Sequence, residues 1–238
     1  MEVMELLKKY KTTKIIKLIN KNKLDVSLED LLMEAINCNK KDLVVYLLDN
    51  KNIYINYIND LNYDYLSMAV SRGNIEIIEL LLKKYFDISR KYEVDNKKVS
   101  IIYFVRDLET LKYLENFMNK KEIKKDLESV ISATLMNYNI ELLEYILTNY
   151  KVNITRIKYK IQDKNYNMLE LSEEILQSMK NREYRKRELA LYISDLLSGK
   201  RYRKIEKRAY QLLEKIEKEN QEIEKYYKYI KKQFGVKK

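Results

Sequence analysis

Apolar residues in the first two-thirds of the chain recur at spacings of three and four, in short paired segments. In residues 65–89, one apolar stripe precedes the turn Arg72-Gly73-Asn74 and a second stripe follows it. This spacing predicts two short amphipathic helices, neither long enough to be stable alone in water. The pair is therefore expected to be one unit of a larger stack. The first stripe consists of Leu66, Ala69 and Val70, and the second of Ile75, Ile78, Leu81 and Leu82.

The same pattern recurs along the chain. A forward shift of 65 residues gives VISATLMNYNIELLEYILTNYKVNI at 130–154, and a backward shift of 34 gives LLMEAINCNKKDLVVYLLD at 31–49. Residues 12–27 and 100–118 fit the pattern as well, the latter with a shortened turn. A spacing near 33 residues is typical of helix-turn-helix solenoids, so the sequence predicts five stacked units.

The residues that carry this repeat resemble those of the ankyrin repeat family. The run from Gly73 to Leu82 resembles the second half of such a repeat, with Ala69-Val70 at the paired alanines and Phe86–Ser89 at the closing turn. The resemblance covers about residues 1–154. It departs from the family at Asp64-Tyr65-Leu66-Ser67, where the family has Thr-Pro-Leu-His, and Gly73 is the only inter-helix glycine among the five units.

We therefore expect an all-α protein with two regions. Residues 1–154 form an ankyrin-like helix-turn-helix solenoid of about five units, and residues 155–238 form a basic C-terminal helical region. In the first region, Ser27 is a candidate N-cap with Asp30 three residues further on. The family resemblance implies that the Tyr-rich connector 49–64 forms a protruding finger, with 90–99 and 119–126 as the equivalent connectors of the next units.

The C-terminal region has a different pattern. Residues 156–162 are equally consistent with a short strand and with an irregular linker, and 168–180 predict a helix. From about Lys200 to Phe234 the apolar residues predict one long helix, with Asn220 as a polar interruption and Tyr227 in the apolar stripe. This helix can pack on the preceding helices, which we prefer, or pair with a second copy as a coiled-coil homodimer.

Positive charge is concentrated in the C-terminal region. Residues 155–238 contain 23 Lys and Arg against 13 Asp and Glu, a net charge of +10, whereas the whole chain has +11. Clustered arginines with interleaved tyrosines suit contact with phosphates or an acidic surface, and a solvated helix face is the competing interpretation. The candidate residues are Arg182, Arg185, Arg187, Arg201, Arg203, Lys204 and Arg208.

Several chemistries lack their usual residues in this sequence. With no His and one Cys, the chain has no Ser-His-Asp or Cys-His arrangement and no thiolate zinc cage. Its three glycines cannot form a Gly-rich phosphate loop. We therefore expect no enzyme activity, no cofactor and no metal. The absence of an apolar signal segment near the N-terminus, and of an apolar run long enough to span a membrane, favours a cytoplasmic location.

The sequence leaves two functional hypotheses from different classes. The first is a non-catalytic module that recognises a protein partner, as an adaptor, inhibitor or effector, through its connectors and first helices. The second is binding of nucleic acid or nucleoprotein by the basic C-terminal helices. The connector tyrosines are expected to form an interface if exposed, or to pack between repeats if not. Carried over position by position, the family resemblance implies as partner-binding residues Asp60, Leu61, Tyr63, Ser71, Arg72, Asp95, Asn96 and Lys98, and the connector tyrosines add Tyr54 and Tyr57.

Overall fold

The computed structural model describes residues 3–84, 86–94, 96–161, 164–181 and 203–236. It divides into two compact units, Met1–Ala133 and Thr134–Lys238. The division falls inside a helix, so it differs from the sequence-based boundary after residue 154, which marks the end of the repeated pattern and stays a prediction.

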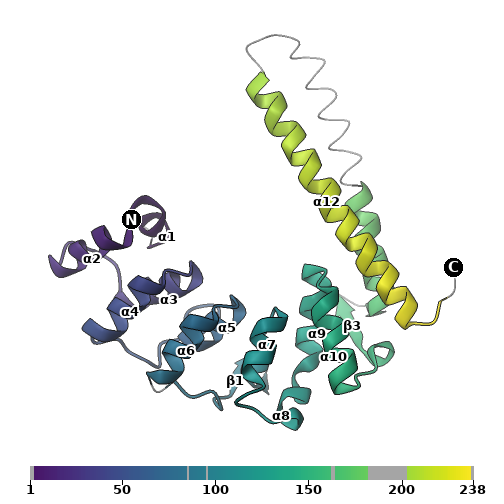
Figure 1. Ribbon diagram of the computed structural model, residues 1–238, viewed down its shortest axis with the longest axis horizontal. Coiled ribbons are helices and arrows are strands. Elements are labelled where there is room, and N and C mark those ends of the chain that lie inside the picture. Colours follow the sequence, from purple (N-terminus) through teal and green to yellow (C-terminus); the bar gives the residue numbers. More distant parts are fainter. Residues whose placement is uncertain (1–2, 85, 95, 162–163, 182–202, 237–238) are drawn as a thin grey trace. The chain divides into compact units, whose positions relative to one another are not determined.

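The first unit consists of successive helical hairpins (Figure 1). In chain order its elements are α1 (Val3–Lys9), α2 (Thr12–Asn20), α3 (Leu28–Asn37), α4 (Lys41–Asn50), α5 (Tyr65–Ser71), α6 (Ile75–Lys83), β1 (Tyr92–Val94), β2 (Lys97–Val99), the 3-10 helix η1 (Ile101–Phe104), α7 (Leu108–Leu114) and α8 (Lys120–Lys125). Helix α9 (Leu127–Asn137) begins in this unit and ends in the next.

The hairpins stack in two layers. Helices α1, α3 and α5 and the 3-10 helix η1 pack in succession as the inner layer, and α2, α4 and α6 pack in succession as the outer layer. The core lies between the layers, where Ile36, Leu43, Ala69 and Ile78 are fully buried. Burial of aliphatic side chains between neighbouring hairpins is the main stabilisation of helices this short. The predicted all-α solenoid is thereby confirmed.

Three of the turns inside the hairpins, those that follow α3, α5 and α9, share one backbone conformation. Asn39, Gly73 and Tyr138 stand at equivalent positions and all have positive φ angles, of 53°, 67° and 53°. In the turn between α3 and α4, the amide of Lys40 donates to the carbonyl of Ala35 at 2.8 Å, as in a Schellman motif. Equivalent bonds close the other two turns, from Asn74 to Ala69 at 3.1 Å and from Asn139 to Thr134 at 2.9 Å. Two hairpins therefore keep this turn without a glycine, with Asn39 and Tyr138 in its place.

We expect Gly73→Ala to lower the free energy of unfolding by about 2 kcal/mol. The substitution forces an alanine into the left-handed backbone conformation and brings its Cβ into a steric clash. A Cβ at this position would lie 2.6 Å from Oδ2 of Asp107, the N-cap residue of α7. Gly235→Ala is the matched control, since Gly235 has φ +68° and a Cβ there would meet no atom within 4 Å. Amide hydrogen exchange of both full-length variants, followed around each substituted position, measures the difference; equal effects would contradict the role of the Asp107 contact.

Some sequence-based assignments need correction. The first helix of the fourth hairpin is the 3-10 helix η1, and residues 119–126, expected to be a connector, contain helix α8. Asn119 caps α8 by accepting from the amide of Glu122 at 3.0 Å, and Ile123 is buried. The expected N-cap at Ser27 is confirmed, because its hydroxyl accepts from the amide of Asp30 at 3.0 Å.

The second unit contains a hairpin, a β-ribbon and two helices that pack together. Residues 158–161 form a strand, so the linker alternative is wrong, and the helix over 168–181 forms close to its predicted range. Its contact with α12 (Arg203–Gln233) includes an ion pair of 2.9 Å between Lys180 and Glu224. The elements that precede this helix are α10 (Ile140–Tyr150), η2 (Ile154–Arg156), β3 (Lys158–Ile161) and its antiparallel partner β4 (Lys164–Asn167).

Helix α12 packs within its own unit through its C-terminal half. Ile223, Tyr226 and Ile230 are fully buried there, and the Tyr226 hydroxyl lies 2.8 Å from the Thr134 hydroxyl. Packing within the chain is therefore present over this half. Among the helices of the described ranges, none has both the length and the apolar character needed to cross a membrane.

Candidate protein-binding surface

The buried carboxylate of Asp64 organises the middle of the first unit. Asp64 is the N-cap residue of α5 and forms a capping box with Ser67, whose amide donates to Asp64 at 2.8 Å and whose hydroxyl accepts from the Asp64 amide at 2.9 Å. Arg90 Nη1 lies 3.2 Å from the same carboxylate, and the Tyr92 hydroxyl donates to it at 3.3 Å. One residue therefore ties the start of α5 to the beginning of the β1–β2 hairpin.

An aromatic cluster reinforces this connection. The ring of Phe104 in η1 lies 5.2 Å from that of Tyr63 and 5.0 Å from that of Tyr92. Burial, together with the nearby charge of Asp64, raises the pKa of Tyr92 well above its ordinary value. The connectors 51–64 and 90–99 thus both pack on the buried ring of Phe104, the first through Tyr63 and the second through Tyr92.

The connector 51–64 is also fastened to the start of α3. The Tyr57 hydroxyl donates to Asp30, and this hydrogen bond, with burial and nearby carboxylates, raises the pKa of Tyr57 to about 12. The amide of Tyr54 donates to Glu29 Oε1 at 3.2 Å. The Tyr57 ring stacks on that of Tyr65, at 6.0 Å, and Tyr65 is fully buried. The connector is therefore held at several points along its length.

The tip of this connector presents apolar side chains outward. Asn59 Oδ1 accepts from the amides of Leu61 and Tyr63, at 3.1 and 2.9 Å, and Asn62 has a φ of 62°. In this closed turn 73% of Leu61 is exposed, and 62% of Tyr54 is exposed nearby in the sequence. We call five exposed residues of this segment the connector surface: Tyr54, Ile55, Ile58, Asp60 and Leu61.

The other predicted contact residues lie on α5 and on the β1–β2 hairpin. Arg72 is exposed and Ser71 half-buried at the end of α5, whereas Asn96 and Lys98 are exposed on the β1–β2 hairpin. The hairpin pairs Val94 with Lys97, and Asn96 has a φ of 61°. Asp95 lies outside the described residues.

The structure divides the predicted tyrosines into two groups. Tyr54 is exposed, as an interface residue would be, whereas Tyr57 and Tyr63 are half-buried and Tyr65 is fully buried. Both interpretations of the connector tyrosines therefore apply, each to different residues. Sequence reasoning missed Ile55 and Ile58, because aliphatic residues alternating with polar ones are equally typical of a buried strand.

The basic candidates lie outside the part of the chain whose side chains the structure describes. Arg203, Lys204 and Arg208 belong to α12, but only their backbone is described, and Arg182, Arg185, Arg187 and Arg201 fall in the undescribed range 182–202. Their predicted role stays a prediction. Within the described ranges, no group of three or more acidic or Cys side chains is arranged to hold a metal ion.

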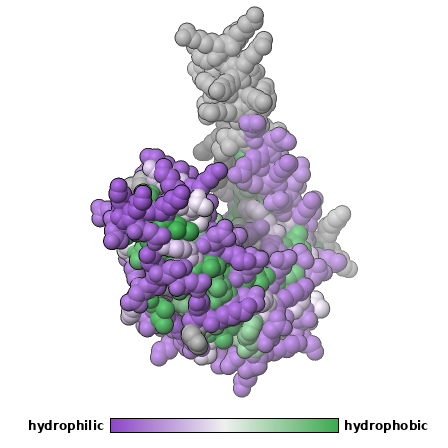
Figure 2. All heavy atoms as spheres, turned by 60° about the vertical axis from the view of Figure 1, so that its left-hand side comes forward, coloured by the Kyte–Doolittle hydropathy of each residue, from purple (hydrophilic) through white to green (hydrophobic). Residues whose placement is uncertain are grey.

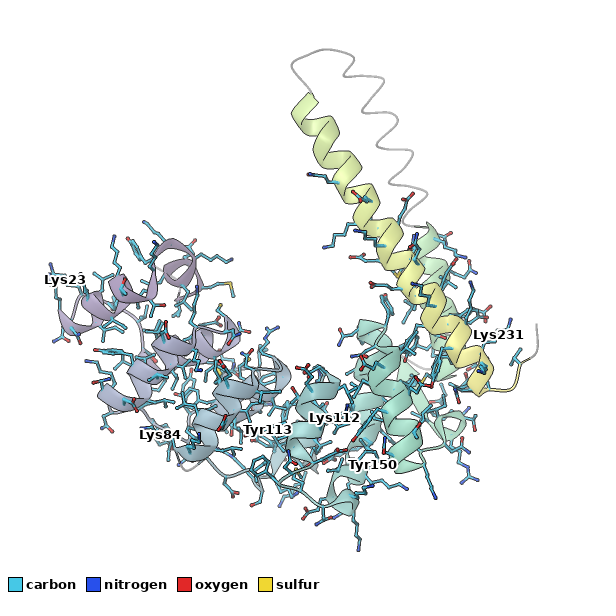
Figure 3. All side chains as sticks on the ribbon, in the orientation of Figure 1. Lys23, Lys84, Lys112, Tyr113, Tyr150 and Lys231 are labelled. Carbon is cyan, nitrogen blue, oxygen red and sulfur yellow. The ribbon has the colours of Figure 1, made fainter. Side chains whose placement is uncertain are left out.

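The outer layer of the array has a different surface from the connector. Three of its carboxylates, on Asp49, Glu76 and Glu79, are paired with lysines of the same or the neighbouring hairpin; one of these lysines, Lys84, is labelled in Figure 3. Asp49 pairs with Lys84 at 2.5 Å, and Glu76 pairs with Lys41 at 3.0 Å. In the view of Figure 2, apolar residues occur in small groups on a largely hydrophilic face. The exposed apolar residues of the connector are therefore a local feature of the array.

Paired helices stacked in two layers, with projecting connectors between the pairs, define a helical repeat protein. Residues 3–92 match the family model for ankyrin repeats, in three copies. The resemblance found in the sequence is thereby confirmed for this range, and ankyrin repeats indicate protein–protein interaction. The later hairpins, beyond residue 92, are assigned from the structure and from the equivalent turn at Tyr138.

One curated protein also shows similarity to the chain. The NAD-dependent deacetylase sir2B of Dictyostelium discoideum is 23% identical over 139 residues, which cover 58% of this chain and 18% of the deacetylase. The chain thus aligns with less than a fifth of that protein. No solved structure matches the chain.

Proposed function

We propose that the protein is a non-catalytic binding module that recognises a protein partner through the connector surface, assisted by Arg72, Asn96 and Lys98. The exposure of Leu61 on a turn closed by its own hydrogen bonds is the observation that best supports this proposal. A turn whose backbone is already fixed loses little conformational freedom on binding, so more of the burial energy of its apolar side chain contributes to affinity.

We propose no deacetylase activity for this chain. The deacetylase is matched over only 18% of its length, and similarity over so small a share does not transfer an activity. The sequence also contains no His to act as a general base or metal ligand.

We expect the double variant Tyr54→Ser/Leu61→Ser to lose most of its bound partner in an affinity pull-down with the full-length chain. Truncating two exposed interface anchors typically weakens binding by about 2 kcal/mol or more, which is a factor of roughly 30. Lys83→Ala, on the exposed outer side of α6, is the control and should retain the partner. Equal retention by the double variant and the wild type would contradict the proposed surface.

A second candidate function follows from the charge of the C-terminal region. We propose, as the alternative, that its arginine clusters bind nucleic acid or the nucleic-acid part of a nucleoprotein, because residues 155–238 carry a net charge of +10. We also propose that two copies of the chain can pair through α12. Because Ile223 and Ile230 are buried within the chain, this pairing would use the N-terminal half of the helix.

Gel-shift titration of the full-length chain with RNA and DNA tests the alternative. We expect binding that weakens by about tenfold or more between 50 and 200 mM salt, since phosphate contacts release counterions. The variant Arg201→Gln/Arg203→Gln/Arg208→Gln should bind more weakly with a shallower salt dependence. Absence of binding at low salt, or unchanged binding by this variant, would contradict the alternative.

A further inference from the structure

Two stretches of this basic protein contain no Lys or Arg. They are residues 24–39, with four acidic residues, and 52–71, with two, so together they carry a charge of −6 in a chain of net charge +11. Lys and Arg make up 47 of the 238 residues, or about one in five, which makes a run of 20 residues without either unusual for this composition. The two stretches include the start of α3 and the connector 51–64.

The fold brings these two stretches together. The Tyr54 amide and the Tyr57 hydroxyl donate to Glu29 and Asp30, so the beginning of α3 lies directly against the connector. The charges of Glu29, Asp30 and Asp60 all help to raise the pKa of Tyr57, as expected for carboxylates gathered around one hydroxyl. The connector surface is therefore flanked by carboxylates from both stretches.

These carboxylates differ from those of the outer layer. Glu29 and Asp30 accept hydrogen bonds from neutral groups, and neither they nor Asp60 form a salt bridge with another residue whose side chain is described. By contrast, Asp49 and Glu79 on the outer layer are paired with lysines. Three of the four carboxylates on α4 and α6 are thus neutralised locally, Asp42 being the exception, whereas Glu29, Asp30 and Asp60 beside the connector form no salt bridge within the described side chains.

A small pocket adjoins Ile55 on this surface. Its volume is about 210 Å³, and its apolar walls are Ile55, Leu66 and Phe86. The charged lining groups are Asp64, Asp87 and Arg90, which together leave one net negative charge. A pocket for a small-molecule ligand usually exceeds about 300 Å³, so this one has the size for a single inserted side chain.

We propose that the connector surface, with Glu29 and Asp30, docks a short segment of a protein partner in which aliphatic residues alternate with Lys or Arg. Aliphatic side chains of the segment cover Tyr54, Ile58 and Leu61, and its basic groups face the unpaired carboxylates. The stem of one basic side chain packs between Ile55 and Phe86, with its charge near Asp87. This inference rests on the proposed function and adds the chemistry of the partner.

The test uses a phage-displayed library of random 12-residue peptides and the full-length chain. Peptides that bind Tyr54→Ser/Leu61→Ser are removed first, and the remaining library is then selected on the wild type. The selected peptides therefore depend on the connector surface, and the selection itself favours no particular peptide charge. We expect the survivors to be enriched in Lys and Arg alternating with aliphatic residues. Survivors that are neutral or acidic, or no survivors above background, would overturn the proposal.

The selected peptides are then synthesised and titrated against charge variants by fluorescence anisotropy in 50 mM salt. Glu29→Gln/Asp30→Asn/Asp60→Asn removes three charges and retains an acceptor oxygen at each position, so we expect about tenfold weaker binding with unchanged circular dichroism. Glu109→Gln, an exposed carboxylate in the first turn of α7, is the matched control and should bind as the wild type does. Equal binding by the triple variant and this control overturns the proposal.

The two proposals fail in different ways. If the pull-down depends on Tyr54 and Leu61 but the library yields acidic or neutral peptides, the surface binds a partner and the basic chemistry is wrong. If the pull-down does not depend on these residues, the proposed function itself is wrong at this surface.

Discussion

Asp64→Ala is expected to lower the stability of the first unit by about 3 kcal/mol. The substitution removes an N-cap, which typically costs about 1 kcal/mol, and leaves Arg90 and the Tyr92 hydroxyl without their shared acceptor, which adds roughly 2 kcal/mol. Asp64 is 1% exposed, so water cannot easily replace the carboxylate. Since the Arg90 side chain is 29% exposed, the contribution of its ion pair is smaller than that of a fully buried pair.

Amide hydrogen exchange of the full-length chain is the appropriate measurement, because a protein with two compact units need not unfold in one transition. Protection should fall in α5 and in the β1–β2 hairpin, with little change in α12. Asp64→Asn is the matched control: it retains an acceptor oxygen for the cap and should lose about 1 kcal/mol. Equal losses from both variants would show that the charge, rather than the cap, is responsible.

The same residue shows what the sequence could predict and what it could not. The helices flanking Gly73 followed from their apolar spacing, and the cap at Ser27 followed from the local sequence, because both depend on neighbouring residues. Asp64 was read only as a departure from the family pattern. Its partners Arg90 and Tyr92 lie 26 and 28 residues further along the chain, and only the stacking of the hairpins brings them to it.

The sequence predicted which connector carries the candidate surface, but it predicted only some of the residues that are exposed there. A connector rich in Asn and Asp indicates turn conformations, as found at residues 51–64. Which of its aromatic rings are exposed depends on distant partners: Asp30 holds Tyr57, and Phe104 holds Tyr63. The conformation of the turn at Tyr138 could not be predicted for a related reason, since tertiary packing maintains a left-handed residue that its sequence disfavours.

In the second unit, Tyr226→Ala is expected to release the C-terminal half of α12. Tyr226 is fully buried, its hydroxyl lies 2.8 Å from that of Thr134, and its ring lies 6.4 Å from that of Tyr138. Burial raises the pKa of this phenol above its ordinary value, consistent with its apolar surroundings. Replacing a buried aromatic residue by alanine typically costs 3–5 kcal/mol, so we expect a loss of about 4 kcal/mol.

Limited trypsin digestion of the full-length chain measures this release, because α12 carries exposed lysines at Lys225 and Lys228. We expect cleavage at these sites to be at least tenfold faster in Tyr226→Ala. Tyr227→Ala is the matched control, since Tyr227 is half-buried and hydrogen-bonds Glu173, and it should accelerate cleavage little. Packing within the chain buries Tyr226 together with Ile223 and Ile230, and it leaves Tyr227 half-buried. A larger effect from Tyr227→Ala than from Tyr226→Ala would therefore contradict this packing.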